Sequence, residues 1–305
     1  MSTSFPFPGS LVALITPFSG GSVDHGALEA LVEKQIAAGQ KGLVPCGSTG
    51  ESATLTHQEH TQVVATVVRA AKGRVPVVAG TGSNATAEAI RLTREAEDAG
   101  ADGALLISPY YNKPTQDGIV EHYTAVAEAT SLPLIVYNIP GRTASTMEVP
   151  TLARLAQVDN IVAVKESTGS IDRVMDTIAA CGSRMAVLSG DDSLTLPMIA
   201  MGASGVISAA ANVIPAEMAG LTDAALAGRW DEARRIHYRV LPLLRALFLE
   251  SNPIPMKAAV AMLGGCRDEL RLPLRRMAPE PRAQLRAAMK ALGLPIEPAT
   301  DEARV

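Results

Sequence analysis

The sequence predicts an α/β protein: a (β/α)8 TIM barrel followed by a small C-terminal helical domain. Short β-branched runs alternate with longer amphipathic runs about eight times in roughly 200 residues, which favours a closed barrel over an open sheet. Many of the helical runs end at a glycine just before the next strand, as left-handed C-caps do. After Gly228 the β-branched runs stop and only helical spacing continues.

The expected strands are short apolar runs that end in polar residues. They span Leu11–Phe18, Gly42–Ser48, Pro76–Gly82, Gly103–Pro109, Pro133–Ile139, Ile161–Ser167, Met185–Asp191 and Gly205–Ala211. The helices expected between them include Asp24–Ala38, Thr56–Ala71, Ala85–Ala99, Gln116–Thr130 and Ile171–Ala180. The glycines expected to end helices are Gly39, Gly73, Gly100 and Gly202.

The stretch after Gly228 is expected to contain helices alone. Its helical runs, separated by proline or glycine, are Asp231–Glu250, Pro255–Gly264 and Pro279–Gly293. We therefore divide the chain into a barrel domain at 1–228 and a C-terminal helical domain at 229–305. The polar tail after Pro298 is expected to be mobile.

The composition disfavours several classes of protein. The chain has 305 residues, 47% of them hydrophobic, and a formal charge of -4, with no basic cluster that could follow a nucleic-acid backbone. No apolar run reaches about 18 residues, and Met1–Ser10 lacks the parts of a secretion signal. Cys46, Cys181 and Cys266 lie far apart and fit reduced thiols better than disulfides or a zinc site. We expect a cytoplasmic protein without a nucleic-acid or membrane partner.

The stretch Ile161–Ser167 carries the clearest chemical indication. Its apolar residues predict a buried strand, yet the strand contains Lys165, and lysine is rarely buried without a reason. Burial lowers the pKa of a lysine, and a neutral amine can attack a ketone to form a Schiff base. An amine that extends past the strand end into water is the alternative.

Polar residues gather where the predicted strands end, which is where TIM barrels build active sites. These segments are Gly47–Ser52, Ser108–Asn112, Tyr137–Arg142 and Ser189–Asp192. The hydroxyls of Ser48 and Thr49, with the backbone N–H groups around them, suit a carboxylate or a ketone oxygen. An ordinary turn would show the same residues.

Two side chains near the predicted lysine offer further chemistry. Tyr137 lies one strand before Lys165, so its phenol is expected near the amine, where it could shuttle protons. Arg142 offers a planar fork for a second carboxylate, or it is a solvated surface side chain. The stretch Gly80–Ala85 matches a dinucleotide-binding G-x-G-x-x-A pattern, but no acidic residue ends the next strand, so we reject a nucleotide site.

Together these motifs resemble the dihydrodipicolinate synthase family, within the superfamily of pyruvate-dependent class I aldolases and N-acetylneuraminate lyase. The matching segments are Gly47–Ser52, Pro109–Asn112, Tyr137–Arg142, Val164–Glu166, Ser189–Asp192 and Asn252–Lys257, within a match from Gly9 to about Leu294. The resemblance implies a lyase that condenses pyruvate with L-aspartate 4-semialdehyde on the diaminopimelate route to lysine. It implies no cofactor and no metal, because the lysine itself serves as the electron sink.

The resemblance also implies roles for individual residues. Lys165 would form the Schiff base, and the proton relay would be Tyr137, Thr49 and Tyr111, the last supplied by a neighbouring subunit. This sharing implies at least a dimer, and the family is usually a homotetramer built as a dimer of dimers. Pyruvate would be bound by Ser48, Thr49, Gly190 and Ile207. Arg142 would receive the carboxylate of the semialdehyde.

Two features qualify the resemblance. Where the family commonly has two threonines, this chain has Ser48 and Thr49, so the hydroxyl is kept and a methyl is lost. A second site, for lysine as feedback inhibitor, is implied at Ser52, Ala53, His57, His60, Asn84, Glu88 and Tyr110. His57 and His60 share one helix face, but no third metal ligand is apparent, and a solvated helix face is the alternative.

Two other functions stay open at this point. One is a pyruvate-dependent class I aldolase that acts on another 2-oxo acid or a sugar acid. Relatives such as N-acetylneuraminate lyase share the lysine and Tyr137 but generally lack the arginine found here at Arg142. The other is a metabolite-binding protein without turnover, which the complete set of Lys165, Tyr137, Thr49 and Tyr111 disfavours.

Overall fold

The computed structural model describes residues 5–296 and contains one large parallel sheet in that range. Its strands are β1 (Gly9–Ala13), β4 (Gly42–Val44), β5 (Val78–Gly80), β6 (Gly103–Ile107), β7 (Leu134–Asn138), β8 (Ile161–Glu166), β9 (Ala186–Ser189) and β10 (Gly205–Ser208). They are shorter than predicted, mainly at their carboxyl ends, because the polar residues there leave the sheet and form loops. A small hairpin of β2 (Phe18–Ser19) and β3 (Ser22–Val23) was not predicted.

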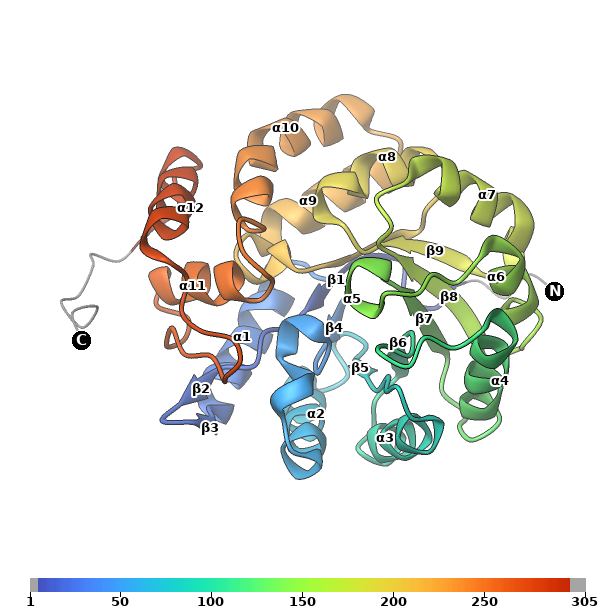
Figure 1. Ribbon diagram of the computed structural model, residues 1–305. Helices are drawn as coiled ribbons and strands as arrows, with labels where there is room; N and C mark the ends of the chain where they lie inside the picture. The colour runs from blue at the N-terminus through green and yellow to red at the C-terminus, as the bar shows by residue number, and fades with distance from the viewer. Residues whose placement is uncertain (1–4, 297–305) are drawn as a thin grey trace.

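The sheet closes on itself. Its strand order is β4-β1-β10-β9-β8-β7-β6-β5, and a parallel bridge between Leu43 and Val77 joins the two outer strands. The Leu43 N–H also donates to the Pro76 carbonyl at 2.9 Å. The strands therefore form a barrel with helices around it, which confirms the predicted (β/α)8 class (Figure 1).

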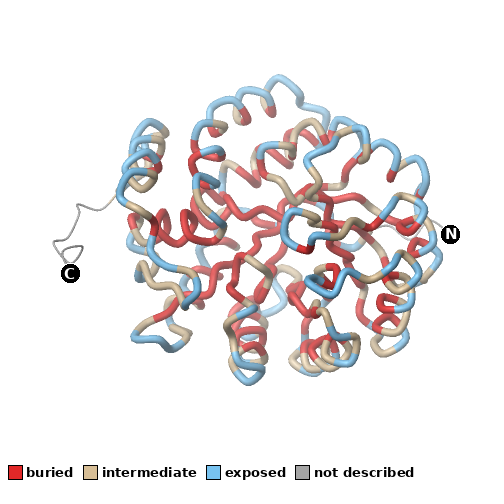
Figure 2. Tube along the Cα trace, viewed as in Figure 1, coloured by how far each residue is buried: buried red, intermediate tan, exposed pale blue. Residues whose placement is uncertain are grey.

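Side chains of the barrel strands alternate between two buried environments. Ile135, Tyr137 and Ala163 face the barrel interior, in one apolar cluster, whereas Val136 and Val164 belong to the cluster between the sheet and the helices. Strands buried on both faces read as continuous apolar runs rather than as alternating ones. Figure 2 shows the buried residues concentrated in the central strands and on the inner sides of the helices.

The helices around the barrel agree with most of the predicted runs. They are α1 (His25–Ala37), α2 (His57–Ala71), α3 (Thr86–Asp98), α4 (Gln116–Ala127), α5 (Pro140–Thr143), α6 (Val149–Leu155), α7 (Ile171–Cys181), α8 (Thr195–Ala200) and α9 (Pro215–Leu226). Five 3₁₀ turns lie between them: η1 (Ser48–Gly50), η2 (Ser52–Thr54), η3 (Gly182–Arg184), η4 (Asp192–Leu194) and η5 (Ala210–Asn212). The predicted cap glycines Gly39, Gly73, Gly100 and Gly202 all have positive φ.

Four of these helices were not predicted. Three of them, α5, α6 and α8, are too short to show a helical period in the sequence. The fourth, α9, is buried on most of its surface, so its apolar residues do not form a one-sided stripe.

The C-terminal helices α10 (Trp230–Ala246), α11 (Ile254–Met262) and α12 (Pro279–Ala291) lie at one side of the barrel (Figure 1). The division of the chain at Gly228 stays a prediction, and the tail after Pro298 lies outside the described residues. Within residues 5–296, no helix is both long and apolar enough to cross a membrane.

A buried ion pair joins α11 to the loop that follows β4. Lys257 Nζ lies 2.5 Å from Glu51 Oε1, and neither side chain is exposed to solvent. Lys257 also donates to the Glu269 carbonyl and lies over the ring of Phe18, and Glu51 accepts from the Arg271 N–H. Two charges in a dry interior stabilise only as a complete pair, since each alone would be uncompensated.

Replacing Lys257 by methionine should therefore destabilise the protein strongly. We expect Lys257→Met to lower the free energy of unfolding by about 3 to 5 kcal/mol, because it leaves the Glu51 charge buried without a partner. The double variant Glu51→Leu/Lys257→Met should recover part of this loss, because it removes both charges. Urea unfolding followed by circular dichroism measures both changes.

The matched control is an exposed ion pair. Arg154 and Asp117 pair at the surface with side chains 51% and 77% exposed, so Arg154→Met should cost less than about 1 kcal/mol. Equal losses in Lys257→Met and Arg154→Met would contradict the importance of the buried pair.

Candidate active site

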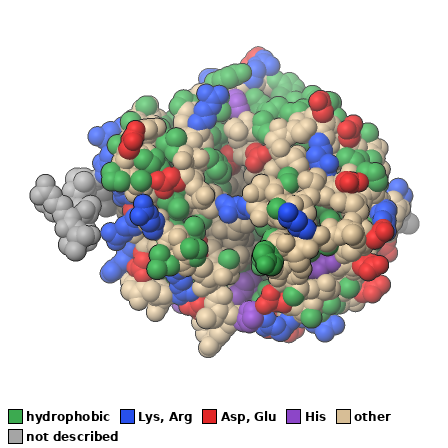
Figure 3. Space-filling view, viewed as in Figure 1, with side chains coloured by type: hydrophobic (Ala, Val, Ile, Leu, Met, Phe, Trp, Pro, Cys, Tyr) green, Lys and Arg blue, Asp and Glu red, His purple; other side chains and the backbone are tan. Residues whose placement is uncertain are grey.

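Tyr137 and Lys165, two of the predicted site residues, lie side by side at the carboxyl end of the barrel. In the ladder between β7 and β8, Tyr137 pairs with Lys165 and Asn138 pairs with Glu166. The helix α5 follows β7 directly and lies in front of the barrel in Figure 1, so this end faces the viewer. Figure 3 shows that the same face is hollowed near its centre, with acidic side chains inside the hollow and basic ones beside it.

Lys165 is buried at this end of the barrel, with only 6% of its surface exposed. Its Nζ lies over the face of the Tyr137 ring, 4.2 Å from the centroid. Burial lowers the pKa of Lys165 to about 8. The amine is therefore neutral in a larger fraction of molecules near neutral pH than an ordinary lysine would be.

Two carboxylates after β9 counteract this effect. The negative charges of Asp192 and Asp191 each raise the pKa of Lys165. Asp192 is buried, where it accepts hydrogen bonds from Ser208 Oγ at 2.5 Å and from the Ala210 N–H at 3.0 Å. Burial and the neighbouring Asp192 charge raise the pKa of Asp191 to about 6.

The phenol of Tyr137 is held in its neutral form. Burial raises its pKa to about 12, although the Ser167 hydroxyl and the Arg142 charge act in the opposite direction. A neutral phenol can both donate and accept a hydrogen bond. The prediction that Tyr137 lies near the amine is correct, but the amine contacts the ring face.

Glu166, the residue after Lys165, forms hydrogen bonds on the outer side of the sheet. Its carboxylate accepts from Asn138 Nδ2 at 3.0 Å, from the Thr168 N–H at 2.9 Å and from Arg173 Nε at 3.3 Å. Asn138 in turn accepts from the Met147 N–H at 3.1 Å. This network ties β7 to β8 beside the Tyr137–Lys165 pair.

Of the two residues predicted to line the pocket, Gly190 borders Lys165. A Cβ added at Gly190 would overlap Ser167 Oγ and would lie 3.1 Å from Lys165 Cε, so a side chain there would have to displace Ser167 and crowd the amine. Ile207 is buried in the apolar cluster inside the barrel, with Tyr137.

Ser48 and Thr49 form the turn η1 after β4. The first N–H groups of such a turn have no acceptor within it, which leaves them for a ligand. Thr16 Oγ1 donates to the Gly50 carbonyl at 2.7 Å and holds the turn against the chain after β1. Asn252 Nδ2 donates to Thr49 Oγ1 at 2.9 Å.

Arg142 and Tyr111 lie at the rim of this end of the barrel. Arg142 is exposed on α5, and its guanidinium donates to the Asn252 carbonyl at 2.7 Å. Tyr111 is 89% exposed and has a backbone φ of 73°, a left-handed conformation that residues other than glycine rarely adopt. Within the single chain, Tyr111 is therefore not packed together with Tyr137 and Thr49.

The residues predicted for a second site lie on the loops and helices next to the barrel opening. His57 Nε2 lies 2.7 Å from Glu88 Oε1, which links α2 to α3. Burial raises the pKa of Tyr110, and the Glu88 charge adds to this effect. Asn84 accepts from Asn112 through its carbonyl at 2.8 Å. Ser52 and Ala53 form part of η2, in front of α2.

His60 differs from the expectation that it shares a surface with His57. It is buried, and its Nε2 pairs with the Gly80 carbonyl at 2.7 Å, because three residues along α2 fall about 60° short of a full turn and direct it toward β5. Within residues 5–296, no group of three or more His, Cys, Asp or Glu side chains is arranged to hold a metal ion.

The glycines of the rejected dinucleotide pattern have a packing role. A Cβ at Gly80 would overlap the Cys46 carbonyl, and a Cβ at Gly82 would overlap the Ile107 N–H. These two glycines therefore let β5 and the residues after it approach the neighbouring strands.

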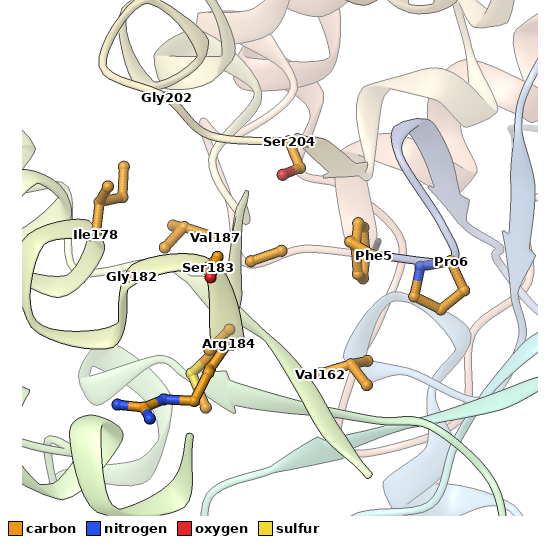
Figure 4. A pocket seen from close by; sticks show the side chains of 12 residues that line it. Phe5, Pro6, Val162, Ile178, Gly182, Ser183, Arg184, Val187, Gly202 and Ser204 are labelled. Carbon is orange, nitrogen blue, oxygen red and sulfur yellow. The ribbon is translucent and has the colours of Figure 1, made fainter. Parts of the chain in front are cut away.

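A cavity of about 220 Å³ lies at the opposite end of the barrel, where the strands begin (Figure 4). Phe5, Val162 and Ser204 line it, and none of the predicted site residues does.

Asn252 contacts two of the predicted site residues, although no local pattern in the sequence predicts a role for it. It belongs to the Asn252–Lys257 segment of the resemblance, which lies in a helical region far along the chain. Only its position in space shows that it belongs to the site.

Residues 6–292 match the model of the Dihydrodipicolinate synthetase family. The 4-hydroxy-tetrahydrodipicolinate synthase of Syntrophobacter fumaroxidans is 55% identical over 289 residues, which are 94% of this chain and 99% of the relative. The crystal structure of dihydrodipicolinate synthase from Aquifex aeolicus superposes with a TM-score of 0.94 at 51% identity, over 96% of this chain and 100% of that chain.

Two further structures contain small molecules. One is the chloride-inhibited dihydrodipicolinate synthase from Acinetobacter baumannii complexed with pyruvate, at 45% identity and a TM-score of 0.93, over 94% of this chain and 99% of that chain. The other is DHDPS from Cyanidioschyzon merolae with lysine bound, at 42% identity and a TM-score of 0.92, over 96% of this chain and 100% of that chain. Because the family model and these relatives cover nearly the whole sequence, the chain belongs to the dihydrodipicolinate synthetase family of enzymes.

Proposed function

We propose that the protein is a 4-hydroxy-tetrahydrodipicolinate synthase that condenses pyruvate with L-aspartate 4-semialdehyde through a Schiff base. The observation that carries this proposal is the buried amine of Lys165, whose pKa falls to about 8. A neutral amine can attack the ketone carbon of pyruvate, and loss of water then gives an iminium. The positive iminium accepts electrons when a methyl proton leaves, so no separate cofactor is needed.

The neighbouring side chains suit the other steps. Tyr137 contacts the amine through its ring and would move protons with Thr49, while the turn at Ser48 and Thr49 would bind the pyruvate carboxylate. Gly190 and Ile207 would line the pyruvate pocket. The relative complexed with pyruvate supports this choice of substrate.

Arg142 would receive the carboxylate of the semialdehyde. Its guanidinium is exposed at the rim of the site and can form two parallel hydrogen bonds to a carboxylate. This residue favours the synthase over the alternative, an aldolase for another 2-oxo acid or a sugar acid. The product would feed the diaminopimelate route to lysine, in the cytoplasm.

The active form would be a homotetramer, in which Tyr111 completes the site of a neighbouring subunit. Its side chain is 89% exposed and is held in a strained backbone conformation, as expected for a residue that reaches outward. A dimer is the smallest assembly in which such sharing works.

Lysine would act as a feedback inhibitor at the second cluster of residues. The Glu88 carboxylate lies beside His57 and is near enough to Tyr110 to contribute to the raised pKa of its phenol. A carboxylate can form a charge-assisted hydrogen bond with the ammonium group of lysine. Ser52, Ala53 and Asn84 would complete the site, and the relative with lysine bound supports it. The buried His60 would act only by supporting the end of β5 at Gly80.

Replacing the proposed nucleophile should abolish the reaction. We expect Lys165→Ala to lose borohydride-dependent trapping of pyruvate and to lower the synthase rate by about 10³-fold or more, because no other amine can form the iminium. The rate is measured with both substrates and purified dihydrodipicolinate reductase, through the loss of NADPH. Lys290→Ala, an exposed lysine on α12, is the control and should be unaffected.

Two results would change the assignment. Covalent trapping that persists in Lys165→Ala would mean that another residue is the nucleophile. Trapping without synthase activity would favour an aldolase with another partner substrate. If the semialdehyde is the substrate, Arg142→Ala should raise its KM by roughly 10- to 100-fold and leave pyruvate trapping intact.

The dependence on pH should report the Lys165 amine. Because the neutral amine reacts, kcat/KM for pyruvate should rise with pH through about 8 and level off above it. The Asp191 charge stabilises the ammonium, so Asp191→Asn should move this midpoint to lower pH. Asp117→Asn, at the exposed pair with Arg154, should leave it unchanged. A midpoint near the ordinary lysine value in the native enzyme would contradict the role of burial.

Lysine should inhibit the enzyme at millimolar concentration. We expect Glu88→Gln to weaken this inhibition by about 10-fold or more, measured as the fraction of each variant's own uninhibited rate, because it removes the carboxylate that pairs with the inhibitor. Glu95→Gln, further along α3, is the matched control. Unchanged activity in the presence of lysine, with no heat of binding in calorimetry, would refute this part of the proposal.

A further inference from the structure

Asn252 contacts two loops of the barrel at once. It lies between α10 and α11, in a segment beside the barrel (Figure 1). Its Nδ2 donates to Thr49 Oγ1 at 2.9 Å, and its carbonyl accepts from Arg142 Nη2 at 2.7 Å. Thr49 follows β4 and Arg142 follows β7, so one residue of the C-terminal region links two separate parts of the proposed substrate pocket.

A buried ion pair close to both residues keeps the Asn252 segment near Thr49. Five residues after Asn252, Lys257 forms the buried ion pair with Glu51, which itself lies two residues after Thr49. The Lys257 N–H also bonds to the Pro253 carbonyl at 2.9 Å, at the start of α11. The ion pair therefore holds the start of α11 against the Thr49 turn, and the backbone bond ties Pro253, the neighbour of Asn252, to Lys257.

The direction of this hydrogen bond determines what the Thr49 hydroxyl can do. A hydroxyl has one hydrogen and two lone pairs, and an amide N–H can only donate. Thr49 Oγ1 therefore uses a lone pair toward Asn252 and keeps its hydrogen. Thr49 is 4% exposed, and within residues 5–296 its hydroxyl has no other hydrogen-bond partner. The free hydrogen is available to an acceptor in the pocket.

We propose that Asn252 is a positioning residue that sets the Thr49 hydroxyl as a hydrogen-bond donor to the carboxylate of pyruvate. This inference rests on the proposed function. By filling a lone pair of Thr49 Oγ1, the amide also polarises the O–H group, which strengthens its bond to an anion. The Asn252 carbonyl also accepts a hydrogen bond from the Arg142 guanidinium and so helps to hold it in place. The C-terminal region therefore contributes to the pocket through this residue.

A double-mutant cycle tests whether Asn252 acts through Thr49. The measured quantity is the pyruvate concentration that gives half-maximal borohydride trapping on Lys165, which needs no second substrate. We expect Asn252→Ala to raise this concentration by about 10-fold, the value of one hydrogen bond to a charged group, with the maximal extent of trapping unchanged within about twofold. In a Thr49→Val background, which has no hydroxyl to orient, Asn252→Ala should change it by less than about twofold.

Two further variants separate this role from a structural one. Asn252→Asp keeps the shape but turns the donor into an acceptor that takes the Thr49 hydrogen, so it should weaken pyruvate binding more than Asn252→Ala does. Asn160→Ala removes an amide that bonds to the Ala127 carbonyl at the other end of the barrel, and it should leave half-saturation unchanged.

Three outcomes would overturn the inference. An unchanged half-saturation in Asn252→Ala would show that the contact does not matter, and equal effects of Asn252→Ala with and without the Thr49 hydroxyl would show that it acts by another route. Tighter binding in Asn252→Asp would mean that Thr49 donates to the amide oxygen instead. Failure of the native enzyme to trap pyruvate would refute the proposed function itself, and is thus distinguishable from all three.

Discussion

The pairing of β7 with β8 is the constraint on which the rest of the site depends. Parallel register places Tyr137 opposite Lys165, and the alternation of side chains then turns both of them into the barrel. The same alternation turns Asn138 and Glu166 outward, where they bond to each other. A slip of one residue would exchange the two sets, leaving a carboxylate in the pocket and a lysine against the helices. The outer hydrogen bonds therefore protect the register that the inner chemistry needs.

Two opposing effects set the pKa of Lys165. Desolvation favours the neutral amine, while the charges of Asp192 and Asp191 favour the ammonium and keep the pKa of Lys165 from falling further than about 8. Burial raises the pKa of Asp192, while hydrogen bonds from Ser208 and a backbone N–H favour its charged form. The site therefore holds a reactive amine beside two carboxyl groups that limit the fall of its pKa.

Several strained backbone conformations lie at the carboxyl end of the barrel. Non-glycine residues with positive φ follow three of its strands: Cys46 and Glu51 after β4, Tyr111 and Lys113 after β6, and Ala144 after β7. Such conformations persist only where surrounding contacts hold them, as the ion pair with Lys257 holds Glu51. The C-terminal helices are thus part of the structure that shapes the pocket, because α11 supplies Lys257.

The sequence alone determined the barrel, because eight buried strands with helices between them leave a periodic pattern. It also singled out Lys165 as the candidate reactive residue, because a lysine in an apolar strand conflicts with its surroundings. It also indicated which polar residues end the strands. Tertiary structure alone decided that His60 turns inward to Gly80, that Tyr111 points out of its own chain and that Asn252 touches Thr49. Those facts depend on contacts between residues far apart in the chain, and local patterns carry no information about such contacts.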